Sequence, residues 1–134
     1  MTSPLDRITV DLAWTRLIAI CDEMAATLVR TSFSTVVRVN HDYACGLFDT
    51  SGTMVAQSTH CSPGHIGCMP RLVKTMCAYF PAEGLRPGDV LLTNDPWLGA
   101  GHTPDTYVVT PAFQQQALVG FAVTSGHKVD IGGR

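Results

Sequence analysis

Charged residues are scarce in this sequence, which also lacks long apolar runs. Asp, Glu, Lys and Arg make up 15% of the 134 residues, against roughly 25% in an average soluble domain. The formal net charge of −2 excludes a protein that binds nucleic acid chiefly through basic charge. No apolar run approaches the ~18 residues of a membrane helix, so we expect no membrane segment. The low charge predicts instead a surface that is buried against a partner.

Motifs for disulfides, secretion and nucleotide binding are absent as well. The five cysteines are odd in number and form no CxxC pair, which predicts reduced thiols and a cytoplasmic protein. The first six residues show neither a basic start nor an apolar stretch, so we expect no secretory signal. The sequence contains no P-loop, no GxGxxG after a strand and no GxSxG elbow. Nothing therefore predicts that this chain alone binds ATP or a dinucleotide.

The apolar pattern predicts an α+β fold. An apolar fraction of 46% is enough for the core of a single domain spanning residues 1–134. Apolar residues at helical spacing predict two amphipathic helices, over 5–31 and about 66–80. Turn residues between two strand-like runs predict a β-hairpin over 42–57. Further strands, in a mixed or antiparallel sheet, are expected at 90–93, 107–110 and 118–124.

The end of the sequence is unusual for a domain. A predicted strand runs into a loop over 126–134 that is rich in His, Asp and Gly, and the chain stops there. Domains rarely finish in such a loop. We therefore expect the 134 residues to be a fragment of a longer protein.

Metal-binding residue types concentrate in the segment 94–105. His102 and Asp105 stand three apart, but Pro104 disfavours a helix. In a straight strand the two side chains would point to opposite faces, so the segment must bend if both are to reach one ion. If 107–110 and 118–124 form a hairpin that turns near Gln115, His127 falls opposite position 103 and beside both residues.

Two imidazoles and a carboxylate suit a divalent metal such as Mn, Fe or Zn. Asp95 or Asp130 would then be a fourth ligand, or an acceptor that orients an imidazole. A simpler interpretation stays open, in which His102 caps a turn and Asp105 stabilises the start of a strand.

His65 is a further candidate, in a small-residue loop before the second helix. It is either a substrate contact or proton carrier, or a histidine hydrogen-bonded to backbone at a helix start. Cys61 and Cys68 flank it, so a metal-binding or nucleophilic role for them also stays open. Trp97 is interpreted as a packing residue, with a pocket wall as the alternative.

Seven short motifs follow one another along nearly the whole chain. They are RTSFS (30–34), DYACGLFD (42–49), HIGCMP (65–70), RPGDV (86–90), NDP (94–96), GHTPD (101–105) and HKVDIGG (127–133). This series resembles the hydantoinase B/oxoprolinase family, which includes the B component of N-methylhydantoinase, the second half of 5-oxoprolinase and the alpha subunit of acetone carboxylase. Members are several times longer than this chain, so the resemblance implies an N-terminal portion.

The resemblance implies a metal-bearing part of a hydrolase that opens a cyclic amide, namely a hydantoin, oxoproline or lactam. A hydantoinase A-like partner subunit would bind ATP, in a hetero-oligomer, and the isolated chain would be inactive. Carried over by position, the metal ligands are His102, Asp105 and His127. The catalytic candidates are His65, from its place before the second helix, and Asp130, which lies beside the ligands. Lys128 departs from the family, many members of which have a second His there. The alternatives are an ATP-dependent ketone carboxylase and a non-catalytic metal-binding or interaction module.

Overall fold

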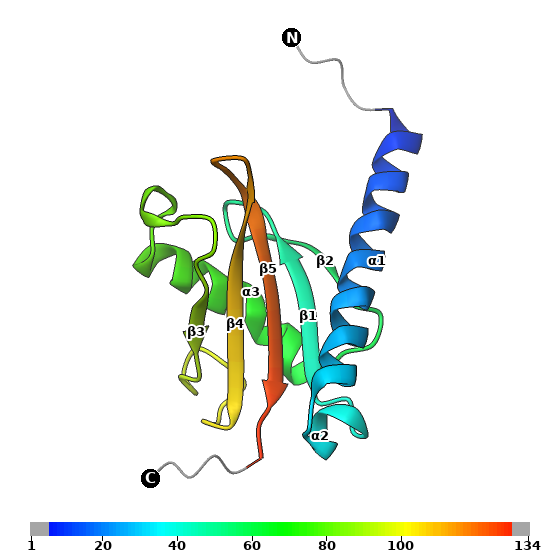
Figure 1. Cartoon of the computed structure of the whole chain (residues 1–134), viewed down its shortest axis with the longest axis vertical. Helices are drawn as coiled ribbons and strands as arrows, with labels where there is room; N and C mark the ends of the chain where they lie inside the picture. The colour runs from blue at the N-terminus through cyan, green and yellow to red at the C-terminus, as the bar shows by residue number, and fades with distance from the viewer. Residues whose placement is uncertain (1–5, 130–134) are drawn as a thin grey trace.

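The computed structural model describes residues 6–129, which form a five-stranded sheet with a long helix on each face (Figure 1). The strand order is β2-β1-β5-β4-β3, and every neighbouring pair is antiparallel. The α+β prediction is therefore confirmed, and the predicted hairpin joins the main sheet because its first strand pairs with β5. The strands are β1 (Tyr43–Phe48), β2 (Met54–Gln57), β3 (Leu91–Thr93), β4 (Asp105–Gln114) and β5 (Ala117–His127).

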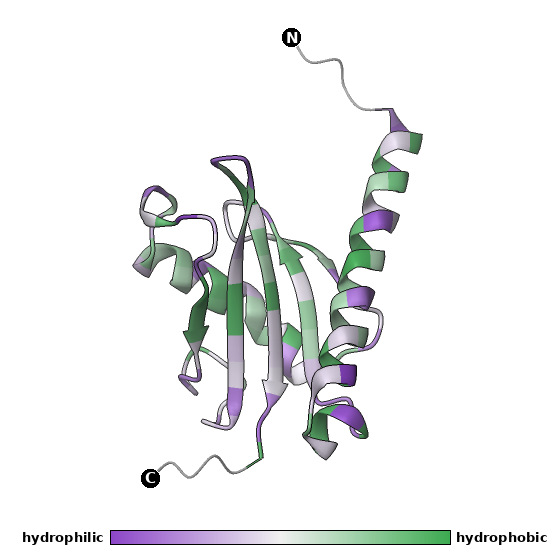
Figure 2. Cartoon of the chain, in the orientation of Figure 1, coloured by the Kyte–Doolittle hydropathy of each residue, from purple (hydrophilic) through white to green (hydrophobic). Residues whose placement is uncertain are grey.

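Helix α1 (Arg7–Thr31) begins and ends close to the predicted bounds. The side chain of Asp6 caps its start by accepting a hydrogen bond of 2.9 Å from the backbone N–H of Thr9. Only Cys21 and Ala25 are buried, because just the second half of the helix packs against β1 and β2. The first half leaves large apolar side chains exposed. Figure 2 colours apolar positions along that half of the helix green.

Helix α3 (Pro63–Tyr79) begins three residues earlier than predicted. Proline suits the first turn of a helix, where its missing N–H would have no partner within the helix, so Pro63 starts α3 inside the predicted loop. His65 consequently lies in the first helical turn rather than in a loop. Phe80, the last residue of the predicted helix, comes after α3 and is exposed.

The main core lies between α3 and the sheet. Side chains alternate across strand β1, so that Ala44 and Phe48 face α3 while Tyr43 and Cys45 face α1. The α1 face carries a smaller cluster with Ala25. The larger cluster contains Ala44, Phe48, Met69, Leu72, Val73, Met76, Leu85, Tyr107, Val109, Phe121 and Val123.

Two short elements were not predicted, because each is too brief to show a period. They are helix α2 (Thr35–Arg38) and the 3-10 turn η1 (Ala82–Gly84). Strands β4 and β5 also extend several residues beyond the predicted 107–110 and 118–124. None of the helices in the described part of the chain is both long and apolar enough to cross a membrane.

Candidate metal centre

Three neighbouring strands bring polar side chains to the same end of the sheet. Asp42 immediately precedes β1, His127 ends β5, and Asp105 begins β4. Asp105 pairs directly with His127, and the backbone N–H of His127 donates to the Asp42 carbonyl at 3.1 Å. The three residues therefore form a row across β1, β5 and β4, with the central histidine between two carboxylates.

The β4–β5 hairpin pairs His127 with a different residue than predicted. The hairpin turns at Gln115 as expected, but the register shifts between Ala112 and Phe113, where β5 accommodates an extra residue. His127 therefore lies opposite Asp105, not opposite position 103. This correction brings the imidazole into direct contact with the carboxylate, since paired residues share one face of a sheet.

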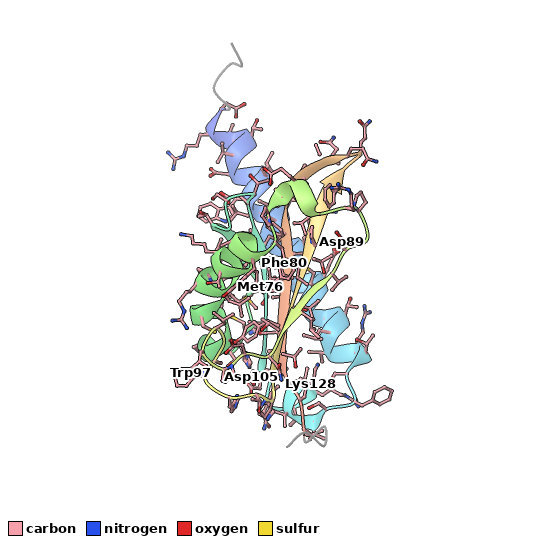
Figure 3. All side chains as sticks on the ribbon, turned by 90° about the vertical axis from the view of Figure 1, so that its left-hand side faces the viewer. Met76, Phe80, Asp89, Trp97, Asp105 and Lys128 are labelled. Carbon is pink, nitrogen blue, oxygen red and sulfur yellow. The ribbon has the colours of Figure 1, made fainter. Side chains whose placement is uncertain are left out.

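His102 reaches the row from the loop before β4. The chain bends between His102 and Asp105, as the spacing required, and only Asp105 belongs to the strand. The loop is held across its ends by the Asn94 side chain, which donates to the Thr103 carbonyl at 3.1 Å. Figure 3 shows Asp105 and Trp97 near the same end of the sheet, on the side of α3.

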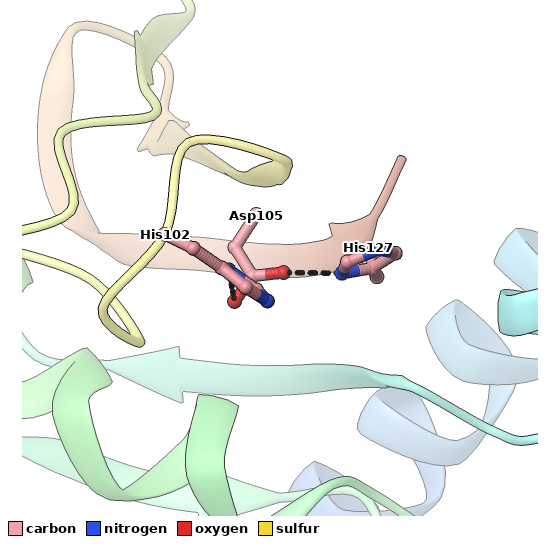
Figure 4. Close-up of side chains that lie close together, drawn as sticks. All are labelled: His102, Asp105 and His127. Atoms are coloured by element: carbon pink, nitrogen blue, oxygen red, sulfur yellow. Dashed lines mark hydrogen bonds and ion pairs between the residues drawn. The ribbon is translucent and has the colours of Figure 1, made fainter. Parts of the chain in front are cut away.

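The carboxylate of Asp105 is the centre of the site. It is 2% exposed, and its Oδ1 lies 2.9 Å from His127 Nδ1 while its Oδ2 lies 3.0 Å from His102 Nδ1 (Figure 4). The two imidazole rings are 5.0 Å apart between centroids. The structure thus brings together the three residues predicted as metal ligands, and each offers an atom that could bind one ion.

A second group shares Asp105 and adds two residues. His65 Nε2 lies 3.2 Å from Asp42 Oδ1 and 3.8 Å from Asp105 Oδ1, and its side chain is 2% exposed. The other Asp42 oxygen lies 3.8 Å from His127 Nδ1. Sequence reasoning missed Asp42. Its position directly before a buried strand was a signal, but only the pairing of β1 with β5 shows that it reaches His127.

Tyr107 contacts the other ring nitrogen of His65. Its hydroxyl lies 3.1 Å from His65 Nδ1 and 3.0 Å from Cys68 Sγ, and its ring is fully buried. Burial raises the pKa of Tyr107, and the contact with Cys68 raises it further, so the phenol keeps its proton. Tyr107 was also missed, because an aromatic residue within an apolar strand gives no sign of a polar partner.

The remaining candidates lie outside this cluster or outside the described residues. Asp95 Oδ1 accepts a hydrogen bond of 2.8 Å from the Trp97 backbone N–H, so its carboxylate stabilises a turn of the loop. Trp97 is 84% exposed, and the predicted packing role is therefore wrong. Cys61 is half-buried, and burial raises the pKa of its thiol. Asp130 lies outside residues 6–129.

The donor set fits a divalent first-row metal. Two imidazoles and a carboxylate, with Asp42 as a further oxygen donor nearby, suit Mn, Fe or Zn. His102 is 52% exposed, so the cluster is open to solvent on the side of the 94–104 loop. The cluster thus combines side chains held at the ends of strands with one side that solvent can reach.

The family profile described as hydantoinase B/oxoprolinase matches residues 6–134. The chain belongs to the hydantoinase B/oxoprolinase family, as the seven motifs predicted. It is 40% identical over 118 residues to 5-oxoprolinase 1 of Arabidopsis thaliana, a match that covers 88% of this chain and 9% of that protein.

Two solved structures share the fold. The ATP-dependent caprolactamase of Pseudomonas jessenii matches with a TM-score of 0.82 and 31% identity, over 98% of this chain and 22% of that one. A nucleotide-free acetone carboxylase matches with a TM-score of 0.78 and 24% identity, over 91% of this chain and 16% of that one. The chain thus corresponds to about a fifth or less of each of these larger proteins.

Proposed function

We propose that this chain is the metal-bearing part of an ATP-dependent enzyme that hydrolyses a cyclic amide, such as a hydantoin, oxoproline or lactam. The observation that carries the proposal is the buried Asp105 carboxylate, held between the imidazoles of His102 and His127. The family contains a 5-oxoprolinase, and a structural neighbour with 31% identity is an ATP-dependent caprolactamase. Both names describe enzymes that act on cyclic amides.

His102, Asp105 and His127 would hold a divalent cation, with Asp42 as a fourth ligand. When bound, Mn, Zn or Fe would supply Lewis-acid polarisation of a water or a carbonyl oxygen. The protein's own contribution is positional. Strands β4 and β5 fix Asp105 and His127 opposite each other, and the exposed His102 leaves the solvent side for the substrate.

ATP would bind to a hydantoinase A-like subunit, because this chain has no nucleotide-binding motif. That subunit would activate the amide carbonyl by phosphorylation. Ring opening would follow when water adds to the activated carbonyl carbon, the C–N bond breaks with a proton passing to the ring nitrogen, and the phosphoryl group leaves as inorganic phosphate. All five cysteines are free thiols, which supports a reducing cytoplasm as the compartment.

The first test is the metal content of the purified chain by mass spectrometry. We expect close to one equivalent of Mn, Zn or Fe per chain in the wild type, and its loss in His102→Ala and Asp105→Asn. His60→Ala is the matched control, because His60 is exposed and lies outside both groups of candidate ligands. Retention of metal by the Asp105→Asn variant would contradict the proposed site.

The second test distinguishes the proposed hydrolase from a ketone carboxylase and from a non-catalytic module. The full-length subunit that contains this chain, expressed with its ATP-binding partner, should open a lactam or hydantoin ring only when ATP is present. A strict requirement for bicarbonate with a ketone substrate would assign the protein instead to the carboxylase branch, whose fold it shares. Metal binding with no turnover in either assay would favour a non-catalytic module.

A further inference from the structure

Half of the sheet is uncovered on the side of α1. Helix α1 packs against β1 and β2, and the short α2 contacts β5 near Gly126. Within residues 6–129, no helix lies over β4 and β3 on that side (Figure 1). Five strands that lie about 4.8 Å apart make a sheet about 19 Å wide, which accommodates two helices about 10 Å in diameter. The face therefore has room for a second helix beside α1.

The uncovered half carries no charged side chain. The sequences of β3, β4 and β5 contain a single Asp, Glu, Lys or Arg residue, which is Asp105, and its side chain faces α3. A sheet face that contacts water ordinarily alternates polar residues with the apolar residues of the buried face. Here the outward positions are mostly apolar or small. They are Leu92, Val108, Thr110, Ala112, Val119 and Thr124.

Helix α1 forms one wall of a groove along this half of the sheet. Two adjoining hollows, of about 500 Å³ and about 470 Å³, meet at Ile20. Ile20, Met24 and Leu28 line the groove at intervals of four residues, so one side of the helix faces it. Thr124 and Val119 contribute from β5. Ridges formed at intervals of four residues are those into which a second helix packs.

The charges on α1 argue against a second copy of this chain as the occupant. The copy would have to offer its own α1, because α3 lies on the other face of the sheet. The exposed residues Arg16, Glu23 and Arg30 recur every seven positions along that helix and so share one side of it. Packing this side against an uncharged sheet would bury charges without partners, which is costly.

The position of the candidate metal centre argues against the ATP-binding subunit. Asp105 and His102 lie on the α3 side, and the cluster opens to solvent at the 94–104 loop. A subunit that delivers an activated substrate has to approach that opening, on the other side of the sheet from the groove. This step rests on the proposed function. What is left is the rest of the subunit, since the chain corresponds to only 22% of the caprolactamase chain.

We propose that an amphipathic helix of the full-length subunit, from outside residues 1–134, lies in the groove beside α1 and covers β5, β4 and β3. Its apolar side contacts Ile20, Met24 and Leu28 on α1 and the uncharged face of the sheet. A charge-free surface of this kind is typical of permanent contacts rather than of partners that come and go. The two helices together then complete the layer that α1 begins.

Maleimide labelling of introduced cysteines measures whether the groove is filled. Thr110→Cys puts a thiol on the uncovered half, and Gln116→Cys, at the exposed hairpin turn, is the control. Both are made in the full-length subunit, and peptide mass spectrometry separates the new thiol from the native ones. Without the ATP-binding partner, Thr110→Cys should react at least about 10-fold more slowly than Gln116→Cys, because a covered thiol reacts only when the structure opens locally.

Every other labelling result contradicts the proposal. Equal rates for the two variants would show that the face is open in the full-length subunit. Protection that appears only when the ATP-binding partner is added would assign the groove to that partner, and protection that is lost on dilution would assign it to a second copy. If Thr110→Cys does not fold in thermal denaturation, Val119→Cys takes its place, since Val119 is 52% exposed and lines the same groove.

Photo-cross-linking identifies the occupant. Benzoylphenylalanine in place of Thr110 or Val119 should give cross-links within one polypeptide, to positions outside residues 1–134. Cross-linked positions three or four residues apart would confirm a helix, whereas positions two apart would show a strand and overturn the proposal. Cross-links between two chains, or none outside residues 1–134, would overturn it as well. Neither experiment requires metal or turnover, so a failure of the proposed function is distinguishable from a failure of this inference.

Discussion

The two faces of the same sheet are used differently. On the α3 face, eleven buried residues form the main cluster, and the Asp105 carboxylate and His65 lie at one end of it. On the α1 face, four residues form a smaller cluster, and the first half of α1 extends past the sheet. The α3 face combines packing and polar contacts in one structure, whereas the α1 face leaves apolar side chains exposed.

The difference shows why the site is held firmly. Asp105, Tyr107 and Val109 alternate along β4, so all three point toward α3 and are buried there. A carboxylate that is 2% exposed is tolerated because three imidazoles surround it. The core and the candidate metal centre are therefore continuous, and damage to one should reach the other.

Substitutions that remove side-chain volume should show the largest difference in stability between the two faces. Leu72→Ala empties a fully buried position on α3, and we expect a loss of about 2–5 kcal/mol in the free energy of unfolding. Leu12→Ala, at a position of α1 that is 66% exposed, should change it by no more than about 0.5 kcal/mol. Urea denaturation measures both. Equal losses would show that the first half of α1 is packed as tightly as α3.

A matched pair of glycine substitutions sharpens the comparison within the α3 face. Gly99→Ala should destabilise the protein by about 1–3 kcal/mol, because the added methyl group collides with the Tyr107 ring. Gly67→Ala in α3 meets nothing within 4 Å and should stabilise the helix by about 0.5–1 kcal/mol. Thermal denaturation gives the sign of each change. A neutral Gly99→Ala variant would mean that the loop is not seated on Tyr107.

High pH should weaken the α1 face. Burial raises the pKa of Cys45 to about 12 and that of Cys21 to about 11, from an ordinary value of 9.0. Below pH 9 both thiols are neutral in the folded and the unfolded chain, so the free energy of unfolding has its full value. Above it the unfolded thiols ionise first, and stability falls by roughly 1.4 kcal/mol per thiol per pH unit until the folded pKa is reached. Urea denaturation from pH 7 to 10 should show this fall.

The variant Cys45→Ala identifies the thiol responsible. Its unfolding free energy should fall less steeply with pH than that of the wild type, because one buried thiol no longer ionises on unfolding. Identical slopes would show that Cys45 is not protected by the packing of α1.

Local patterns predicted much of this fold. The helical spacing gave α1 within two residues, and the turn residues gave the β1–β2 hairpin. The triad His102, Asp105 and His127 was also predictable, because a hairpin brings its two ends together within a short stretch of chain.

Other features depend on contacts between distant segments. Asp42 joins the site only because β1 pairs with β5, some 80 residues further along the chain. The burial of His65 depends on where α3 packs, and its contact with Tyr107 joins a helix to a strand. The exposure of Trp97 follows from the path of a loop. No periodicity in the sequence carries this information.

The extra residue in the β4–β5 hairpin sets a rule for length variation among related sequences. At this point Gly120 approaches β1 so closely that a Cβ would lie 2.3 Å from the Phe48 carbonyl oxygen. An insertion at the turn around Gln115 would only lengthen a loop. One residue inserted between Phe121 and His127 would turn the imidazole to the other face and separate it from Asp105. Gaps in an alignment of the family should therefore gather at the turn and spare the strand segment that follows Gly120.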